Sequence, residues 1–163
     1  MTPEVFAAGV DIVGPSNLET LLATIPPYWA SFYETLCRRV GDPRTPEGLA
    51  HLQDCSPLHR CADIARPLLI GQGANDPRVK QSESDQIVAA MNAAGVPVTY
   101  VLFPDEGHGF ARPENNQAFY AVVEPFLAQS IGGRAAPIGE LGGATIQVPS
   151  GAAYIPGLVH ALT

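Results

Sequence analysis

The stretch RPLLIGQGANDPRVKQSESDQIVAAMNAAGVPVTYVLFP, residues 66–104, carries in turn the patterns of a strand, a helix and a second strand. Its first part, Arg66–Gly73, is a short apolar run ended by glycine, which predicts a buried strand. Val79–Gly95 places apolar side chains at helical spacing before a closing glycine, so we expect an amphipathic helix. Val96–Pro104 is rich in β-branched and aromatic residues, which favours another strand. This order predicts a parallel sheet covered by helices on both faces.

The flanking segments extend the pattern. Ala7–Val13 is an apolar run ended by glycine and proline, which predicts a third strand. A final helix over Pro113–Gly133 contains Pro125, which should kink or interrupt it. The tail, 134–163, is rich in Gly, Pro and Ala, and we expect an extended, weakly ordered appendage. Three further helices are expected over 16–27, 28–41 and 45–55. The predicted fold class is therefore α/β, with about three parallel strands flanked by helices.

Composition narrows the classes of partner. The 163 residues suit one domain, and the net charge of -7 argues against a nucleic-acid partner. No apolar run approaches the ~18 residues of a membrane helix, and the N-terminus lacks a basic signal-peptide region. From the chain alone we therefore expect a cytoplasmic protein with no membrane contact. Cys37, Cys55 and Cys61 match no zinc spacing and are expected to be ordinary thiols.

Two loops that leave the carboxyl ends of predicted strands carry reactive residues. Asp76 follows the strand Arg66–Gly73, and His108 follows the strand Val96–Pro104. Because ligands meet parallel sheets at these ends, the carboxylate and the imidazole can come together there. The carboxylate would accept the Nδ1–H of His108 and leave the other nitrogen free to act as a base. Taken alone, Asp76 could equally cap a turn, and His108 could be a loop residue with a local bond.

The stretch from Pro67 to Gln129 resembles the C-terminal part of the catalytic domain of the prolyl oligopeptidase family. The family elements G-x-x-D-x-R-V and E-G-H-G-F both occur in it, at residues 73–79 and 106–110. The resemblance implies an α/β-hydrolase fold and a serine peptidase that acts on short peptides without a cofactor or a metal. It also implies that Asp76 is the triad acid, that His108 is the triad base and that Arg78 binds a substrate carbonyl. For a full-length parent, it leaves a periplasmic or secreted location open.

The family's nucleophile lies in a G-x-S-x-G turn, and this sequence contains no such pentapeptide. The nearest match is GPSNL, residues 14–18, in which Ser16 precedes the acid and the base. Leu18 replaces the second glycine and would clash in the sharp turn, so we expect Ser16 to be a helix cap or a pocket-wall residue. Ser150 follows the histidine and fits less well. By the resemblance, the nucleophile turn would lie immediately before Met1.

These motifs predict a C-terminal fragment. Residues 1–133 would be a partial α/β-hydrolase domain without the N-terminal half of its sheet, and 134–163 a C-terminal extension. A chain with acid and base but no nucleophile is expected to be inactive alone. Its strand 7–13 would expose an unpaired edge that invites self-association or an upstream fragment. The alternative is a non-catalytic remnant that acts as a binding or assembly partner through this edge.

Histidines and aromatic residues elsewhere offer two further interpretations. A metal site built from His51, His59 and His108 is disfavoured, because His51 and His59 lie too far apart for one helical i,i+4 pair. Trp29 and Phe32 could help to line a substrate pocket, although residues at helical spacing are more often part of a core.

Overall fold

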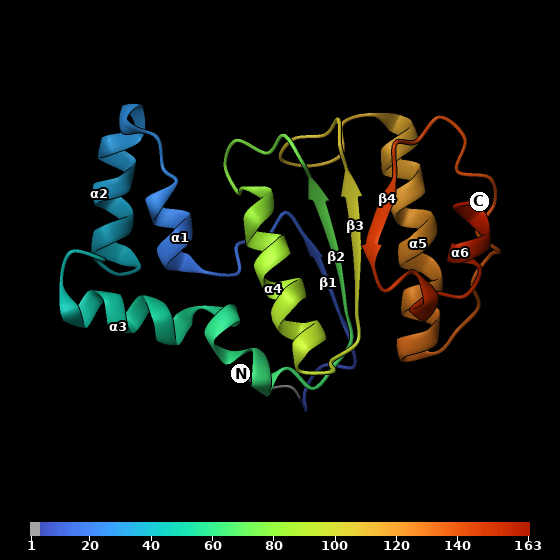
Figure 1. Ribbon diagram of the computed structural model, residues 1–163, viewed down its shortest axis with the longest axis horizontal. Helices are drawn as coiled ribbons and strands as arrows, with labels where there is room; N and C mark the ends of the chain where they lie inside the picture. The colour runs from blue at the N-terminus through green and yellow to red at the C-terminus, as the bar shows by residue number, and fades with distance from the viewer. Residues whose placement is uncertain (1–3) are drawn as a thin grey trace.

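The computed structural model describes residues 4–163 and contains an open sheet with helices on both faces (Figure 1). Three strands run parallel and lie in the order β1 (Gly9–Ile12), β2 (Leu68–Gly73) and β3 (Val98–Phe103). A fourth strand, β4 (Gln147–Ser150), lies beside β3 and runs antiparallel to it. The predicted α/β class and its parallel strands are confirmed, and each strand is somewhat shorter than the sequence indicated.

The central strands bury side chains on both faces of the sheet. One face packs against α5 (Pro113–Ile131), and the other packs against α4 (Gln81–Ala93). Because successive side chains of a strand point to opposite faces, both sets must be apolar. Each fully buried side chain of this kind stabilises the fold by about 1.5–3 kcal/mol. Leu69, Val101 and Phe103 belong to the α5 face, and Ile70, Tyr100 and Leu102 to the α4 face.

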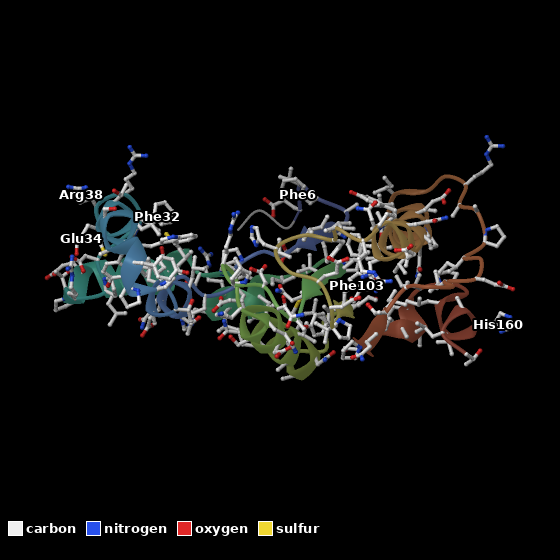
Figure 2. The ribbon with its side chains drawn as sticks, turned by 90° about the horizontal axis from the view of Figure 1, so that it is seen from above. Phe6, Phe32, Glu34, Arg38, Phe103 and His160 are labelled. Carbon is white, nitrogen blue, oxygen red and sulfur yellow. The ribbon has the colours of Figure 1, made fainter. Side chains whose placement is uncertain are left out.

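A group of helices lies to one side of the sheet (Figure 1). It comprises α1 (Leu18–Ala23), η1 (Pro27–Trp29), α2 (Ala30–Arg39), α3 (Pro46–Cys55) and η2 (Pro57–Asp63). From above, Phe32 of this group lies at one end of the molecule, Phe103 of the sheet near the middle and His160 at the other end (Figure 2).

The buried carboxylate of Glu83 on α4 attaches this helical group to the sheet. It accepts hydrogen bonds from the backbone N–H groups of Ser16, at 3.1 Å, and Asn17, at 2.8 Å, at the start of α1. The side chain of Asn17 is the N-cap of α1, since its Oδ1 accepts from the N–H of Glu19. A carboxylate at a helix N-terminus is stabilising there, because it satisfies free N–H groups.

The last long helix, α5, contains a proline in its interior. We predicted that Pro125 would kink or interrupt the helix. The interruption is wrong, because α5 continues from Pro113 to Ile131 with Pro125 buried inside it. A proline in a helix costs about 3 kcal/mol, and burial of neighbouring side chains such as Phe119, Val122 and Phe126 offsets that cost. Among the helices of residues 4–163, none combines the length and the apolar character that crossing a membrane requires.

The C-terminal tail is ordered, and the prediction of an extended, weakly ordered appendage is wrong. After β4 it forms η3 (Ala152–Tyr154) and the short helix α6 (Leu158–Ala161). Ile155 and Leu158 are buried in the core formed by α5. Gly151 adopts φ +76°, and a Cβ there would lie 2.0 Å from the carbonyl oxygen of Val98, so only glycine fits. The apolar residues of the tail are irregularly spaced among glycines and prolines, which is why periodicity did not reveal a structured segment.

Candidate active site

The loops that follow β2 and β3 are joined by hydrogen bonds. The N–H of Ala74 donates to the carbonyl of Phe103 at 3.0 Å, and the N–H of Asn75 donates to the carbonyl of Glu106 at 2.9 Å. Where β2 ends, a Cβ on Gly73 would lie 2.2 Å from the carbonyl oxygen of Gly107. Only glycine allows the two loops to approach so closely. The two loops are therefore held in a fixed relation to each other.

This relation brings Asp76 and His108 together, as the sequence predicted. Asp76 Oδ2 lies 2.8 Å from His108 Nδ1. The Asp76 side chain is 0% exposed, whereas the His108 side chain is 32% exposed. The carboxylate is thus sequestered behind the imidazole, and the imidazole is the member of the pair that solvent or a substrate can reach.

The other oxygen of Asp76 caps the turn that follows it. Oδ1 accepts the N–H of Arg78 at 2.8 Å and the N–H of Val79 at 2.9 Å. The two interpretations of Asp76 are therefore compatible, because one oxygen caps the turn and the other contacts the histidine. Because the turn holds Oδ1, the carboxylate cannot rotate freely, and Oδ2 stays directed at His108.

This geometry sets the proton arrangement of the imidazole. An ionised carboxylate only accepts hydrogen bonds, so His108 Nδ1 carries the hydrogen and donates it to Asp76. In a neutral ring the lone pair is then on Nε2, the nitrogen that does not contact Asp76. An imidazole held in this tautomer can take a proton from a nearby hydroxyl and return it later. The arrangement is suited to general base and general acid chemistry.

Arg78 lies on the rim of this loop. Its backbone N–H is used by Asp76, and the residue is exposed to solvent. The guanidinium takes part in none of the ion pairs found among residues 4–163. A cation so placed can reach an oxygen of a bound ligand, and its role as a carbonyl-binding residue stays a prediction.

Glu106 fixes the loop that carries His108, and we did not single it out in the sequence. It is 3% exposed and accepts the N–H groups of Ala111 and Arg112, each at 2.9 Å, and the side-chain amide of Asn115 at 2.9 Å. Burial alone would raise the pKa of Glu106, but these hydrogen bonds outweigh it and lower the pKa. The signal available in the sequence was an acid two residues before the histidine, in E-G-H-G-F, while its burial and its partners are visible only in the structure.

Ser16 is engaged away from the acid–base pair. It is 4% exposed, and its hydroxyl donates to the backbone carbonyl of Glu83 at 2.6 Å and accepts from the amide of Gln86 at 3.0 Å. These contacts tie the chain after β1 to α4. The prediction of Ser16 as the helix cap is wrong, because the N-cap of α1 is Asn17. Ser16 is instead a buried residue that joins two segments of the chain.

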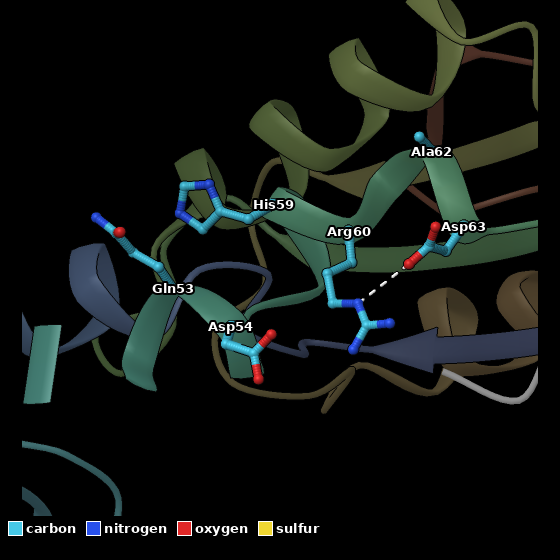
Figure 3. Close-up of a pocket in the computed structure, with 6 residues that line it drawn as sticks. All are labelled: Gln53, Asp54, His59, Arg60, Ala62 and Asp63. Atoms are coloured by element: carbon cyan, nitrogen blue, oxygen red, sulfur yellow. Dashed lines mark hydrogen bonds and ion pairs between the residues drawn. The ribbon is translucent and has the colours of Figure 1, made fainter. Parts of the chain in front are cut away.

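The helical group has a groove of its own, distinct from the acid–base pair. It has a volume of about 640 Å³ and is lined by α3 and η2, with Gln53, Asp54, His59 and the ion-paired Arg60 and Asp63 among its walls (Figure 3). These side chains are mixed in charge, and the groove is shallow and open. Nothing in it indicates a particular ligand.

The histidines and aromatic residues of the helical group were the basis of two further interpretations, a metal site and a core. His51 contacts Cys55, at 3.6 Å from Nε2 to Sγ. In the part of the chain that the structure describes, no three His, Cys, Asp or Glu side chains gather as metal ligands would. Trp29 and Phe32 are 37% and 50% exposed and meet edge to face, so a place in the core is wrong for both.

A parallel sheet with an aspartate after one strand and a hydrogen-bonded histidine after the next defines a part of an α/β-hydrolase catalytic domain. The model of the prolyl oligopeptidase family matches residues 1–134. The chain therefore belongs to the prolyl oligopeptidase family of peptidases.

Known proteins of similar sequence or structure are consistent with this family. Dipeptidyl aminopeptidase BIII of Pseudoxanthomonas mexicana is 68% identical over 162 residues, which is 99% of this chain and 24% of that protein. Dipeptidyl peptidase family member 6 of Caenorhabditis elegans is 52% identical over 83% of this chain and 18% of its own length. A Mycobacterium tuberculosis puromycin-hydrolyzing peptidase has a TM-score of 0.70 at 25% identity, over 80% of this chain and 20% of that one. The chain spans a quarter or less of these proteins.

Proposed function

We propose that this chain supplies the acid and the base of a serine peptidase triad, as the C-terminal part of the catalytic domain. Asp76 orients His108, and His108 activates a serine that lies outside these 163 residues. The observation that carries the proposal is the 2.8 Å contact between Asp76 Oδ2 and His108 Nδ1, with Oδ1 held by two backbone N–H groups.

The chemistry follows from this arrangement. His108 Nε2 takes the proton of the serine hydroxyl as its oxygen attacks the peptide carbonyl, and Asp76 stabilises the imidazolium that forms. The same Nε2 then gives the proton to the leaving amine, and the cycle repeats with water on the acyl-enzyme. Arg78, exposed beside the pair, binds a substrate carbonyl in this proposal. No metal or cofactor takes part.

The substrate class comes from the relatives. Two of them are named as dipeptidyl peptidases, so we propose that the complete enzyme removes dipeptides from short peptides. The chain contains no G-x-S-x-G, and we propose that it is inactive alone.

The free edge of β1 offers a place for the upstream part of such an enzyme. β1 pairs with β2 on one side, and its Val10 and Ile12 are 37% and 40% exposed. A strand added here would complete the hydrogen bonding of β1 and cover these side chains. Without that partner, the same edge would pair with a second copy of the chain.

The experiment that tests the function is a chimera. The segment of the Pseudoxanthomonas mexicana enzyme that aligns with this chain is replaced by this chain, which their 68% identity makes feasible. Hydrolysis of a dipeptidyl p-nitroanilide is then measured. We expect an active chimera, an inert His108→Ala variant and an unimpaired His59→Ala variant, since His59 is an exposed residue of the helical group.

Two outcomes would reject the proposal. In one, the folded chimera does not turn over any substrate, which would favour the remnant that only binds other chains through β1. In the other, His108→Ala stays as active as the unchanged chimera, which would remove His108 from the mechanism.

A further inference from the structure

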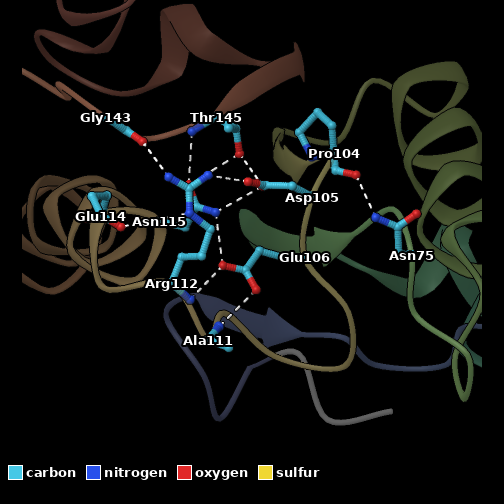
Figure 4. A network of polar contacts seen from close by, with 10 residues as sticks. All are labelled: Asn75, Pro104, Asp105, Glu106, Ala111, Arg112, Glu114, Asn115, Gly143 and Thr145. Atoms are coloured by element: carbon cyan, nitrogen blue, oxygen red, sulfur yellow. Dashed lines mark hydrogen bonds and ion pairs between the residues drawn. The ribbon is translucent and has the colours of Figure 1, made fainter.

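The loop that carries His108 is closed at its base by an ion pair. Asp105 comes three residues before the histidine and Arg112 four residues after it, and their side chains are paired (Figure 4). Asp105 also accepts from the side-chain amide of Asn115 at 3.0 Å. Because His108 lies between these two residues in the sequence, the ion pair joins the two ends of the loop that carries it.

The C-terminal tail contacts both members of this ion pair. The hydroxyl of Thr145 donates to Asp105, and the guanidinium of Arg112 donates to the carbonyl of Gly143 at 3.1 Å. These contacts hold the pKa of Asp105 at about 2, with the Thr145 hydroxyl as the largest cause and Arg112 next. The tail thus fixes the position of the Asp105 carboxylate and that of the Arg112 guanidinium (Figure 4).

Asn115 connects the tail to both acids of the loop. It is 0% exposed, and its amide nitrogen donates to Asp105 and, at 2.9 Å, to Glu106. Its amide oxygen accepts the backbone N–H of Thr145 at 2.9 Å. The N–H of Thr145 therefore fixes which way round the amide lies, since a reversed amide would face that N–H with another donor.

The tail is itself firmly held, so it can act as a support. β4 pairs with β3, the strand from which the histidine loop departs, with Leu102 opposite Gln147. Further along, Leu158 is fully buried against the α5 core. The family model ends at residue 134, whereas the relative that is 68% identical aligns over 162 residues of this chain. The support therefore lies outside the segment that defines the family.

We propose that the tail, 134–163, is a positioning element of the histidine loop, and that Thr145 is its central positioning residue. By holding Asp105 and Asn115, Thr145 keeps the loop closed and His108 aligned on Asp76. This inference rests on the proposed function, because the alignment matters for activity only if His108 is the base. Its test reads the alignment directly and needs no turnover.

The test measures how fast the Nδ1–H proton of His108 exchanges with water, by NMR of the complete chain labelled with ¹⁵N-histidine. Thr145→Val removes the hydroxyl and keeps the shape, and we expect exchange to become about tenfold faster, as for the loss of one hydrogen bond. Thr145→Ser keeps the hydroxyl and should restore the slow rate. The matched control is Ser150→Ala, which removes a tail hydroxyl that contacts Asn92 instead of the loop.

Amide exchange at Leu69 in β2 reports global unfolding in the same samples. Exchange of the His108 Nδ1–H should stay well above the rate at Leu69, which would show that the loop opens locally and not by unfolding of the whole chain. Unchanged Nδ1–H exchange in Thr145→Val, no restoration in Thr145→Ser, or an equal effect of Ser150→Ala would each overturn the inference. Fast exchange of the His108 Nδ1–H in the unchanged chain would also overturn it, because there would then be no alignment for the tail to maintain. An inactive chimera with the expected exchange pattern would reject the proposed function and leave this inference standing.

Discussion

Replacing Asp76 with asparagine separates its two tasks. Oδ1 of the new side chain can still accept the N–H groups of Arg78 and Val79, now at 2.8 and 2.9 Å, so the turn is kept. The amide NH2 would then face His108 Nδ1, which must become an acceptor and move its hydrogen to Nε2. A flipped amide would set its NH2 against the two backbone donors, so only the first orientation is favourable.

The size of the effect follows from these contacts. With its hydrogen on Nε2, His108 cannot take the serine proton, and we expect kcat of the active chimera to fall about 10⁴-fold. KM should change little, because the buried Asp76 touches no substrate. All three hydrogen bonds of this side chain are kept but no longer involve a charged carboxylate. At a loss of up to about 1 kcal/mol for each bond, the free energy of unfolding should fall by about 1–3 kcal/mol.

The assay is the initial rate of dipeptidyl p-nitroanilide hydrolysis by the chimera, with unfolding followed by circular dichroism. Asp63→Asn is the matched control, since it also removes one carboxylate but from an exposed pair with Arg60. If Asp76→Asn keeps more than about a tenth of the kcat, well short of the expected fall, the orienting role of Asp76 is refuted.

Three further changes test the surrounding structure. Gly73→Ala should lower the free energy of unfolding by about 3 kcal/mol, measured by urea titration, because its Cβ would collide with the carbonyl of Gly107. Leu158→Ala should cost about 2–5 kcal/mol in the same titration, whereas a dispensable tail would show no loss. The pKa of Asp105 is lowered from 3.8 to about 2, so the stability it gives is complete above about pH 4 and is lost as the pH falls towards 2. Urea midpoints at pH 5, 3 and 2 should show this loss, and Asp105→Asn should lack this part of it.

Sequence patterns predicted the parts of the molecule that depend on local periodicity and on chain order. The run around Leu69, the helix around Ile87 and the run around Val101 each have the spacing of their element, and the structure contains all three. The contact between Asp76 and His108 was predictable for the same reason, because the ends of neighbouring parallel strands meet at one edge.

Other features depend on contacts that no local pattern records. The order of the tail comes from pairing with β3 and from burial of Leu158, each supplied by residues distant in sequence. Pro125 is tolerated because packing of α5 outweighs a local penalty. The support of the histidine loop by Thr145 joins residues 40 apart, from Thr145 to Asp105, and only the fold brings them together.

In the proposed mechanism, His108 activates a serine that this chain does not contain. The most direct measurement is labelling with a fluorophosphonate probe, followed by mass spectrometry to locate the modified serine. We expect no label on the chain alone, a label on an upstream serine of the chimera, and loss of that label in His108→Ala. A label on Ser16 or on any other serine of these 163 residues, or one that persists in His108→Ala, would contradict the account.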